Sequence, residues 1–260
     1  MPTTTADDGT ELYYEVEGSG EAITFVGEAG LGAWQWGSQY AAMTGPYQTV
    51  VWDFRGTGRS GSPSGDLNVD RLSQDLESVL AAADCKNCHL VGAGLGGMVC
   101  LRYARMFDRA ETLTLFNTAP SGETVDLDAL ETLCLPGTDR EDIESSLSVA
   151  LSPEFRDANP EVLDRIVGWR GEENADAGAF AKQAAAIEGF EADPLYELTV
   201  PTLVCQAQDD PVVDSTVGEE LSADLPRGTF VPVEGRHLCF FEHARPVTDR
   251  MLGFIEDESD

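Results

Sequence analysis

Histidine and carboxylate side chains are the residues of this chain best placed for acid–base chemistry. The 260 residues include only three histidines, and one of them, His237, follows the last predicted strand. Asp210 lies at the end of the strand predicted before it. A histidine oriented by a carboxylate can take a proton from water or from a bound substrate. We therefore predict that Asp210 and His237 form a hydrogen-bonded dyad. A structural histidine and a loop aspartate are the alternative.

The other carboxylates and histidines near these positions are weaker candidates. Asp209 is the neighbour most easily confused with the acid of the dyad. His89 begins a predicted strand, and His243 lies near the start of the predicted last helix. We expect both of these histidines to be structural or solvated.

Three glycine-rich stretches follow predicted strands. Residues 25–30 read Phe-Val-Gly-Glu-Ala-Gly, and residues 52–60 read Trp-Asp-Phe-Arg-Gly-Thr-Gly-Arg-Ser. Residues 90–97 read Leu-Val-Gly-Ala-Gly-Leu-Gly-Gly. Small residues at the first and last glycine of Gly92-Ala93-Gly94-Leu95-Gly96 let a strand turn sharply into a helix. This pattern indicates loops that bring the backbone close to a site.

Together with the segments that hold Asp210 and His237, these loops resemble, in order and spacing, those of one family: the α/β-hydrolase fold. Residues 25–30 are similar to its oxyanion loop, usually His-Gly-x-Pro-Gly, and residues 52–60 to its D-x-R-G-x-G-x-S loop. Residues 90–97 take the place of the nucleophile elbow. The resemblance implies that Asp210 is the acid and His237 the base of a catalytic triad. It covers almost the whole chain.

The nucleophile of that triad is missing. The family pattern is G-x-S-x-G, whose central residue is normally Ser, Cys or Asp, and Gly94 stands there. Glycine adopts the strained backbone conformation of this position without the cost that a side chain carries. Gly94 is therefore predicted to keep the bend while leaving the nucleophile position vacant, and it cannot form an acyl-enzyme.

Glu28 is the second departure from the family. The resemblance implies that the backbone N–H groups of Glu28 and Leu95 form the oxyanion hole, with the Glu28 side chain lining the pocket. An ionised carboxylate there would oppose a developing oxyanion. Val26 also replaces the usual histidine of this loop. The alternatives are that Glu28 turns outward, or that the register slips by one residue.

The elements that must hold these loops alternate between strand and helix. Strands are predicted at seven places and helices at three. The strands are residues 11–17, 22–26, 49–52, 89–91, 112–116, 202–207 and 229–233. One helix follows Asn68, and the others span 95–107 and about 246–255. Strands separated by helices favour an α/β fold with a mostly parallel central sheet and helices on both faces.

The pattern changes between residues 120 and 195, where helical signals are interrupted by prolines and no strand is predicted. We therefore expect an α/β-hydrolase core formed by residues 1–119 and 196–260, with residues 120–195 as a helical cap insertion. Trp169, Phe155 and Phe180 are candidates for an apolar wall of the pocket beneath it.

The net charge of the chain indicates the environment in which the protein works. There are 16 Lys and Arg against 47 Asp and Glu, which gives a net charge of −31. Such a surface repels nucleic acid and anionic membranes, so neither is an expected partner. An acidic, lysine-poor chain with ordinary apolar content is typical of a salt-accumulating cytoplasm, because molar salt shortens the Debye length to about 3 Å. We predict a halophilic, cytoplasmic protein whose oligomeric state is open.

Neither a cofactor nor a metal is expected. Cys85-Lys86-Asn87-Cys88-His89 matches the pattern for covalent haem attachment, but the chain starts without an export signal. We interpret the two cysteines as incidental thiols, with a redox or metal pair as the alternative. The sequence contains no run of about 20 apolar residues, so no membrane span is predicted.

Three functions are compatible with this sequence. The first is a small-molecule hydrolase or lyase in which His237, oriented by Asp210 and assisted by Glu28, is a general base without a covalent serine intermediate. The second is a non-catalytic protein that binds a ligand or partner on the hydrolase fold. The third is a serine hydrolase whose nucleophile has been changed to Gly94, and Val26 and Glu28 argue against that reading because a single change would leave the oxyanion loop in its usual form.

Overall fold

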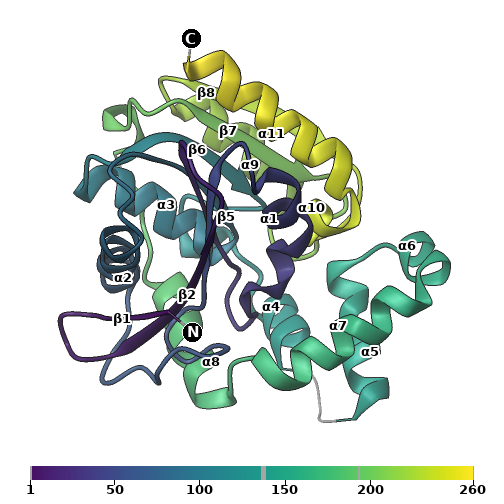
Figure 1. Cartoon of the computed structure of the whole chain (residues 1–260). Coiled ribbons are helices and arrows are strands. Elements are labelled where there is room, and N and C mark those ends of the chain that lie inside the picture. The colour runs from purple at the N-terminus through teal and green to yellow at the C-terminus, as the bar shows by residue number, and fades with distance from the viewer. Residues whose placement is uncertain (1, 136–138, 193, 260) are drawn as a thin grey trace.

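An eight-stranded sheet forms the centre of the molecule, shown in Figure 1 as a computed structural model that describes residues 2–135, 139–192 and 194–259. In chain order the strands are β1 (Thr3–Thr5), β2 (Glu11–Glu17), β3 (Ala22–Val26), β4 (Gln48–Trp52), β5 (Cys88–Ala93), β6 (Ala110–Phe116), β7 (Thr202–Ala207) and β8 (Gly228–Val233). Their order across the sheet is β1-β2-β4-β3-β5-β6-β7-β8. The strand β2 pairs antiparallel with both β1 and β4, and the six strands from β3 to β8 are parallel to one another. The predicted α/β fold is confirmed.

Hydrophobic burial explains why the central strands form. Every residue of β3 and of β5 is buried, as expected for parallel strands covered on both faces. The register places Val26, the last residue of β3, beside Gly92 of β5. The loops that follow these two strands therefore leave the same edge of the sheet side by side.

Helices cover both faces of the sheet. On one side α2 (Val69–Ala82) packs against α3 (Leu95–Met106), which contacts β5 and β6; on the other, α1 (Gly37–Met43) packs against α11 (Ala244–Ser259) (Figure 1). Asn68 caps α2 as predicted, since its side-chain oxygen accepts the Arg71 N–H at 2.8 Å. The remaining core elements are the 3-10 turn η1 (Ala33–Trp36), α9 (Ser215–Asp224) and α10 (Cys239–Glu242).

Between β6 and β7, all regular elements within the described residues are helical. They are η2 (Gly122–Thr124), α4 (Leu127–Cys134), α5 (Arg140–Ala150), α6 (Pro153–Ala158), α7 (Pro160–Glu173), α8 (Ala177–Glu188) and η3 (Leu195–Glu197). Figure 1 shows α5, α6 and α7 grouped at the lower right, beside the sheet domain. The division of the chain into a core and a cap at residues 120 and 195 stays a prediction, and four of the residues in that range, 136–138 and 193, lie outside the described ones.

Candidate active site

The turn between β5 and α3 is a sharp one centred on Gly94. Its backbone has φ 50° and ψ −113°, in the region that favours glycine. The flanking glycines are required by close packing: a Cβ at Gly92 would lie 2.5 Å from the Gly96 carbonyl oxygen, and one at Gly96 would lie 2.2 Å from the Val26 oxygen. The predicted bend is present, and it brings the N-terminus of α3 against the end of β3.

Asp210 and His237 are hydrogen-bonded to each other. The Nδ1 atom of His237 lies 3.0 Å from both carboxylate oxygens of Asp210, and both side chains are about 1 % exposed or less. Asp210 is held in turn by the Val212 N–H at 2.8 Å and the Gln206 amide at 3.3 Å. This geometry leaves Nε2 of His237 as the ring atom that faces the site.

Asn117 holds the histidine loop in place. It follows β6 directly, with φ 49°, and its amide nitrogen donates to the His237 carbonyl at 2.6 Å. Its side-chain oxygen accepts the Ala207 N–H at 2.7 Å. The sequence reasoning missed this residue; an asparagine directly after a buried strand was the available signal, because Asn tolerates a positive φ.

The Glu28 side chain occupies the place of the missing nucleophile. A Cβ at Gly94 would lie 1.4 Å from Glu28 Oε2, too close for both to exist in these positions. The same Oε2 lies 2.7 Å from Nε2 of His237. The other oxygen, Oε1, accepts the N–H of Leu95 at 3.1 Å and that of Ala29 at 2.5 Å. Glu28 is 1 % exposed, so the carboxylate is enclosed by these partners.

Two details differ from the sequence-based expectation. We expected a gap between His237 and Gly94, and the Glu28 carboxylate fills it. We also expected the Glu28 N–H to form the oxyanion hole, but that group donates to the Gln35 side-chain oxygen at 3.0 Å. Its place is taken by the N–H of Ala29, one residue further, which points at the carboxylate together with Leu95. The loop turns one residue later than expected because Gln35 binds the Glu28 amide.

Two buried glutamines fix the loop that carries Glu28. Gln35 accepts from the Glu28 amide and donates to the carbonyl of Gly32 at 3.0 Å. Gln183, on α8, accepts the Gly30 N–H at 2.7 Å and donates to the carbonyl of Arg55 at 3.1 Å. The loop is therefore tied both to itself and to a helix of the segment between β6 and β7.

The charge state of His237 follows from its two carboxylate neighbours. Burial alone would lower its pKa, but the charges and hydrogen bonds of Asp210 and Glu28 outweigh burial and raise the pKa to about 10. Near neutral pH His237 is therefore an imidazolium, with Nε2 carrying a proton. In the resting site it is a proton donor, and it becomes a base only after it has lost that proton.

The cavity beside this network is small and mostly apolar. Its volume is about 10 Å³, which is about the space that one water needs. Glu28, Gly94, Asn117 and His237 lie on its walls. The other lining residues are apolar: Leu95, Met98, Ala119, Val125, Leu130, Ile187, Val212 and Val213.

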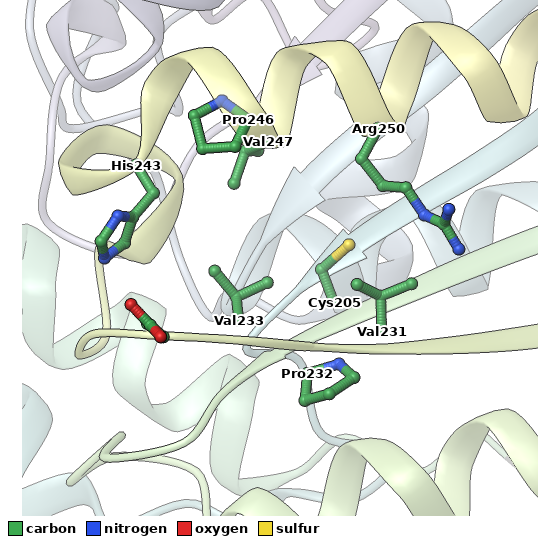
Figure 2. A pocket seen from close by; sticks show the side chains of 9 residues that line it. Cys205, Val231, Pro232, Val233, His243, Pro246, Val247 and Arg250 are labelled. Carbon is green, nitrogen blue, oxygen red and sulfur yellow. The ribbon is translucent and has the colours of Figure 1, made fainter.

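A larger hollow, of about 410 Å³, lies elsewhere, between β8 and α11 (Figure 2). Figure 2 shows Val231 and Val233 of β8 facing Val247 of α11, with His243 and Arg250 toward its two ends. None of the residues that line it also lines the Glu28 cavity. The titratable network of the site therefore lies in the smaller space.

The remaining histidines and the cysteine pair lie outside the site. The His89 ring is buried against the Thr112 hydroxyl at 2.9 Å, and burial lowers its pKa. His243 is partly exposed beside Glu242. All six cysteines are free and buried, and burial raises the pKa of Cys85 to about 11. Within residues 2–135, 139–192 and 194–259 no group of three or more His, Cys, Asp or Glu is arranged to hold a metal ion.

The network limits the chemistry that the site can perform. Gly94 has no side chain to attack a substrate, and both N–H donors that would hold an oxyanion already hold Glu28 Oε1. The groups available for reaction are a carboxylate that accepts three hydrogen bonds and an imidazolium that Asp210 orients. In the part of the chain that the structure describes, no helix is both long and apolar enough to cross a bilayer.

Comparison with known proteins agrees with this fold. The sequence model of the Alpha/beta hydrolase family matches residues 25–250. The chain is 26% identical to a candidate carbamate hydrolase, RutD, of Azorhizobium caulinodans, over 94% of each protein, and 23% identical to 3-oxoadipate enol-lactonase 1 of Acinetobacter baylyi, over 95% of this chain and 94% of the lactonase. The enol-lactonase of Burkholderia xenovorans LB400 superposes with a TM-score of 0.84 and 23% identity, over 98% of this chain and 100% of that structure. A match over this much of its length shows that the chain belongs to the alpha/beta hydrolase family.

Proposed function

We propose that this protein is a small-molecule hydrolase in which the Asp210–His237 dyad works without an elbow serine and with Glu28 as a third ionisable member. The observation that carries the proposal is the 2.7 Å hydrogen bond between Glu28 Oε2 and Nε2 of His237. It joins a proton acceptor and a proton donor at the point where a serine hydroxyl would lie. The relatives named as a carbamate hydrolase and an enol-lactonase support hydrolysis as the reaction class.

Each member of the network has a distinct part in this proposal. Asp210 orients His237 through Nδ1 and stabilises its positive charge. The imidazolium can give its Nε2 proton to a departing oxygen and, once neutral, can take a proton from water. Glycine at position 94, in place of a serine, therefore rules out acyl-serine chemistry, while acid–base chemistry stays possible at the same place.

A second candidate function, a non-catalytic ligand-binding or interaction protein, is favoured by the size of the cavity. A space of about 10 Å³ holds one water and no larger ligand unless the helices above it move. The buried, mutually satisfied charges of Glu28, His237 and Asp210 would then stabilise the fold alone.

The placement of Glu28 argues against an isolated change of serine to Gly94. Removal of a side chain alone leaves a space, whereas here a carboxylate fills it and satisfies the two N–H donors and the histidine. Gly94 and Glu28 are better explained as one arrangement of two residues.

A small uncharged molecule is the expected substrate, and location in the cytoplasm stays a prediction.

Hydrolysis assays on a panel of small esters, lactones, carbamates and epoxides separate these functions. We expect the wild-type protein at molar KCl to hydrolyse at least one class, and His237→Gln and Asp210→Asn to lose that activity. Glu111→Gln, which removes a carboxylate on β6 outside the site, is the matched control and should keep it. Activity that survives in His237→Gln would rule out this site, and the absence of any turnover would favour the non-catalytic reading.

A further inference from the structure

The hollow between β8 and α11 is a groove with apolar walls. Its volume of about 410 Å³ lies within the range of about 300–1,000 Å³ that is usual for small-molecule sites. Val231 and Val233 of β8 face Val247 of α11 across it (Figure 2). The Cys205 thiol also lines the groove; burial raises its pKa to about 12, so it stays protonated and behaves as a small apolar group. The groove can therefore bury an apolar chain.

One end of the groove carries a cation without an anionic partner. The Arg250 side chain extends from α11 at this end (Figure 2). Among the residues that the structure describes, none forms an ion pair or a hydrogen bond with its guanidinium. Arg227, which precedes β8, is by contrast paired with Glu258 of α11. The chain has 47 Asp and Glu against 16 Lys and Arg, so an arginine that has no carboxylate beside it and lines a groove leaves a place for an anionic group.

The end of the groove near His243 is acidic. Figure 2 shows Val233 on the side of His243, and Glu234, which also lines the groove, directly follows Val233. The His243 ring itself lies 3.6 Å from the Glu242 carboxylate. An anionic group is therefore attracted to the Arg250 end and repelled from the other end. From His243 to Arg250 the helix rises about 10 Å, at about 1.5 Å per residue, which matches a chain of about eight carbons.

The edge of the sheet beside the groove does not suit a peptide strand. β8 is the last strand of the described sheet, so the backbone groups that point away from β7 have no strand partner there. The Val233 carbonyl accepts the N–H of Gln208, which follows β7. Backbone groups alternate in direction along a strand, so those of Pro232 point outward, and proline has no N–H to donate. A peptide or a second copy of the chain is thus disfavoured as an added strand, and a free small molecule is favoured.

We propose that the groove between β8 and α11 binds a free aliphatic monocarboxylate of about eight carbons. The planar guanidinium of Arg250 donates two parallel hydrogen bonds to the carboxylate. The alkyl chain lies between Val231, Val233 and Val247. None of the residues that line the groove lines the Glu28 cavity, so this site is separate from the proposed active site and does not depend on the hydrolase function.

Titration with octanoate at molar KCl tests the proposal, with calorimetry for affinity and ¹³C-methyl NMR of labelled valines for location. We expect one octanoate to bind per chain and to shift the methyl signals of Val231, Val233 and Val247. Arg250→Gln should weaken binding about tenfold, as expected for lost hydrogen bonds between charged groups. Arg245→Gln is the matched control, because Arg245 is an exposed arginine of the same helix that does not line the groove, and it should bind octanoate as the wild type does.

The apolar part of the groove is tested separately. Octanoate should bind about fourfold more tightly for each methylene that it has beyond hexanoate. Octan-1-ol, which has the same chain without the charge, should bind more weakly than octanoate to the wild type and equally to Arg250→Gln. Val231→Phe fills the groove from β8 and should abolish octanoate binding, with thermal melting as the check that this variant is folded.

Four results would overturn the proposal. The absence of valine shifts at millimolar octanoate would exclude the groove as a site. An equal loss of affinity in Arg245→Gln and Arg250→Gln would exclude recognition of the carboxylate by Arg250. Tighter binding of octan-1-ol, or of an acetylated trivaline peptide, than of octanoate would exclude an aliphatic acid as the ligand. None of these results bears on the hydrolysis assays, because octanoate has no ester, lactone, carbamate or epoxide bond to cleave.

Discussion

The Glu28 carboxylate occupies the space that a side chain at Gly94 would need: its oxygen Oε2 lies 1.4 Å from where a Cβ at position 94 would be. The same carboxylate meets the two N–H groups of the oxyanion hole and the imidazole of His237. One side chain from the loop after β3 thereby occupies both the nucleophile position and the oxyanion position. Any restoration of a serine must displace it.

Gly94→Ser alone is therefore expected to give no esterase. The backbone at φ 50° costs a residue with a side chain about 1–3 kcal/mol, and the new atoms overlap with Glu28. Hydrolysis of p-nitrophenyl acetate and the melting temperature are the measurements. Gly94→Ala, with the same strain and overlap but no hydroxyl, is the control and should lose similar stability. Gly94→Ser combined with Glu28→Gly should show turnover; robust hydrolysis by Gly94→Ser alone would mean that Glu28 leaves its place readily.

Glu28→Gln should lower the pKa of His237 from its value of about 10. The amide keeps the shape of the side chain but removes one of the two negative charges that hold the proton. NMR titration of ¹³C-labelled histidine rings measures the change. Glu111→Gln is the control: Glu111 lies 3.7 Å from the His89 ring, so its removal should move the titration of His89 and not that of His237. An unchanged His237 titration in Glu28→Gln would contradict the hydrogen-bonded pair.

Stability should fall as the pH rises above neutrality. The folded pKa of His237, about 10, is above its ordinary value of 6.5, so proton binding favours the folded state. This contribution is fully present below about pH 6.5 and is lost as the pH rises through about 10. Urea unfolding between pH 6 and 10.5 measures it. His237→Gln should show a flatter profile over this window, and His243→Gln, a change at a partly exposed ring, should keep the wild-type slope. Equal slopes in all three proteins would refute the raised pKa.

Salt should stabilise the fold steeply. With a net charge of −31, self-repulsion destabilises the compact state at low ionic strength, and screening reduces it. Thermal melting in increasing KCl, up to molar concentration, should show a continuous rise in melting temperature. Sucrose at matched osmolality, which does not screen charge, should have a smaller effect. A melting temperature that KCl does not change would contradict the halophilic interpretation.

Much of the fold could be predicted because it depends on long, periodic or continuous apolar patterns. The fully buried strands β3 and β5 and the amphipathic helix α2 carry such patterns, and their predicted bounds agree with the structure within two residues. By contrast, β1 is three threonines on the edge of the sheet, and α1 is a seven-residue helix that contains a glycine. Neither has a local pattern; tertiary contacts form both.

The residues of the candidate site could be predicted from the sequence, but not all of their contacts could. The positions of Asp210 and His237 follow from their places after β7 and β8, so the dyad could be anticipated. The direction of the Glu28 side chain could not, because it depends on Gln35 binding the Glu28 amide and on empty space at Gly94. A shift of one residue within a loop leaves no trace in hydrophobic periodicity. The role of the Ala29 N–H was missed for the same reason.

The hydrogen bond from the Gly30 N–H to the Gln183 side chain makes the hydrogen exchange of one backbone amide a measure of how often the site opens. The Gly30 N–H is buried and bound to a side chain of α8, so it can exchange with solvent deuterium only when α8 separates from the loop. Because Gly30 lies two residues after Glu28, the same separation removes one of the hydrogen bonds that hold the segment carrying the carboxylate, while the bond from the Glu28 amide to Gln35 remains. The exchange rate of this single amide therefore gives a lower limit on how often α8 separates from the loop.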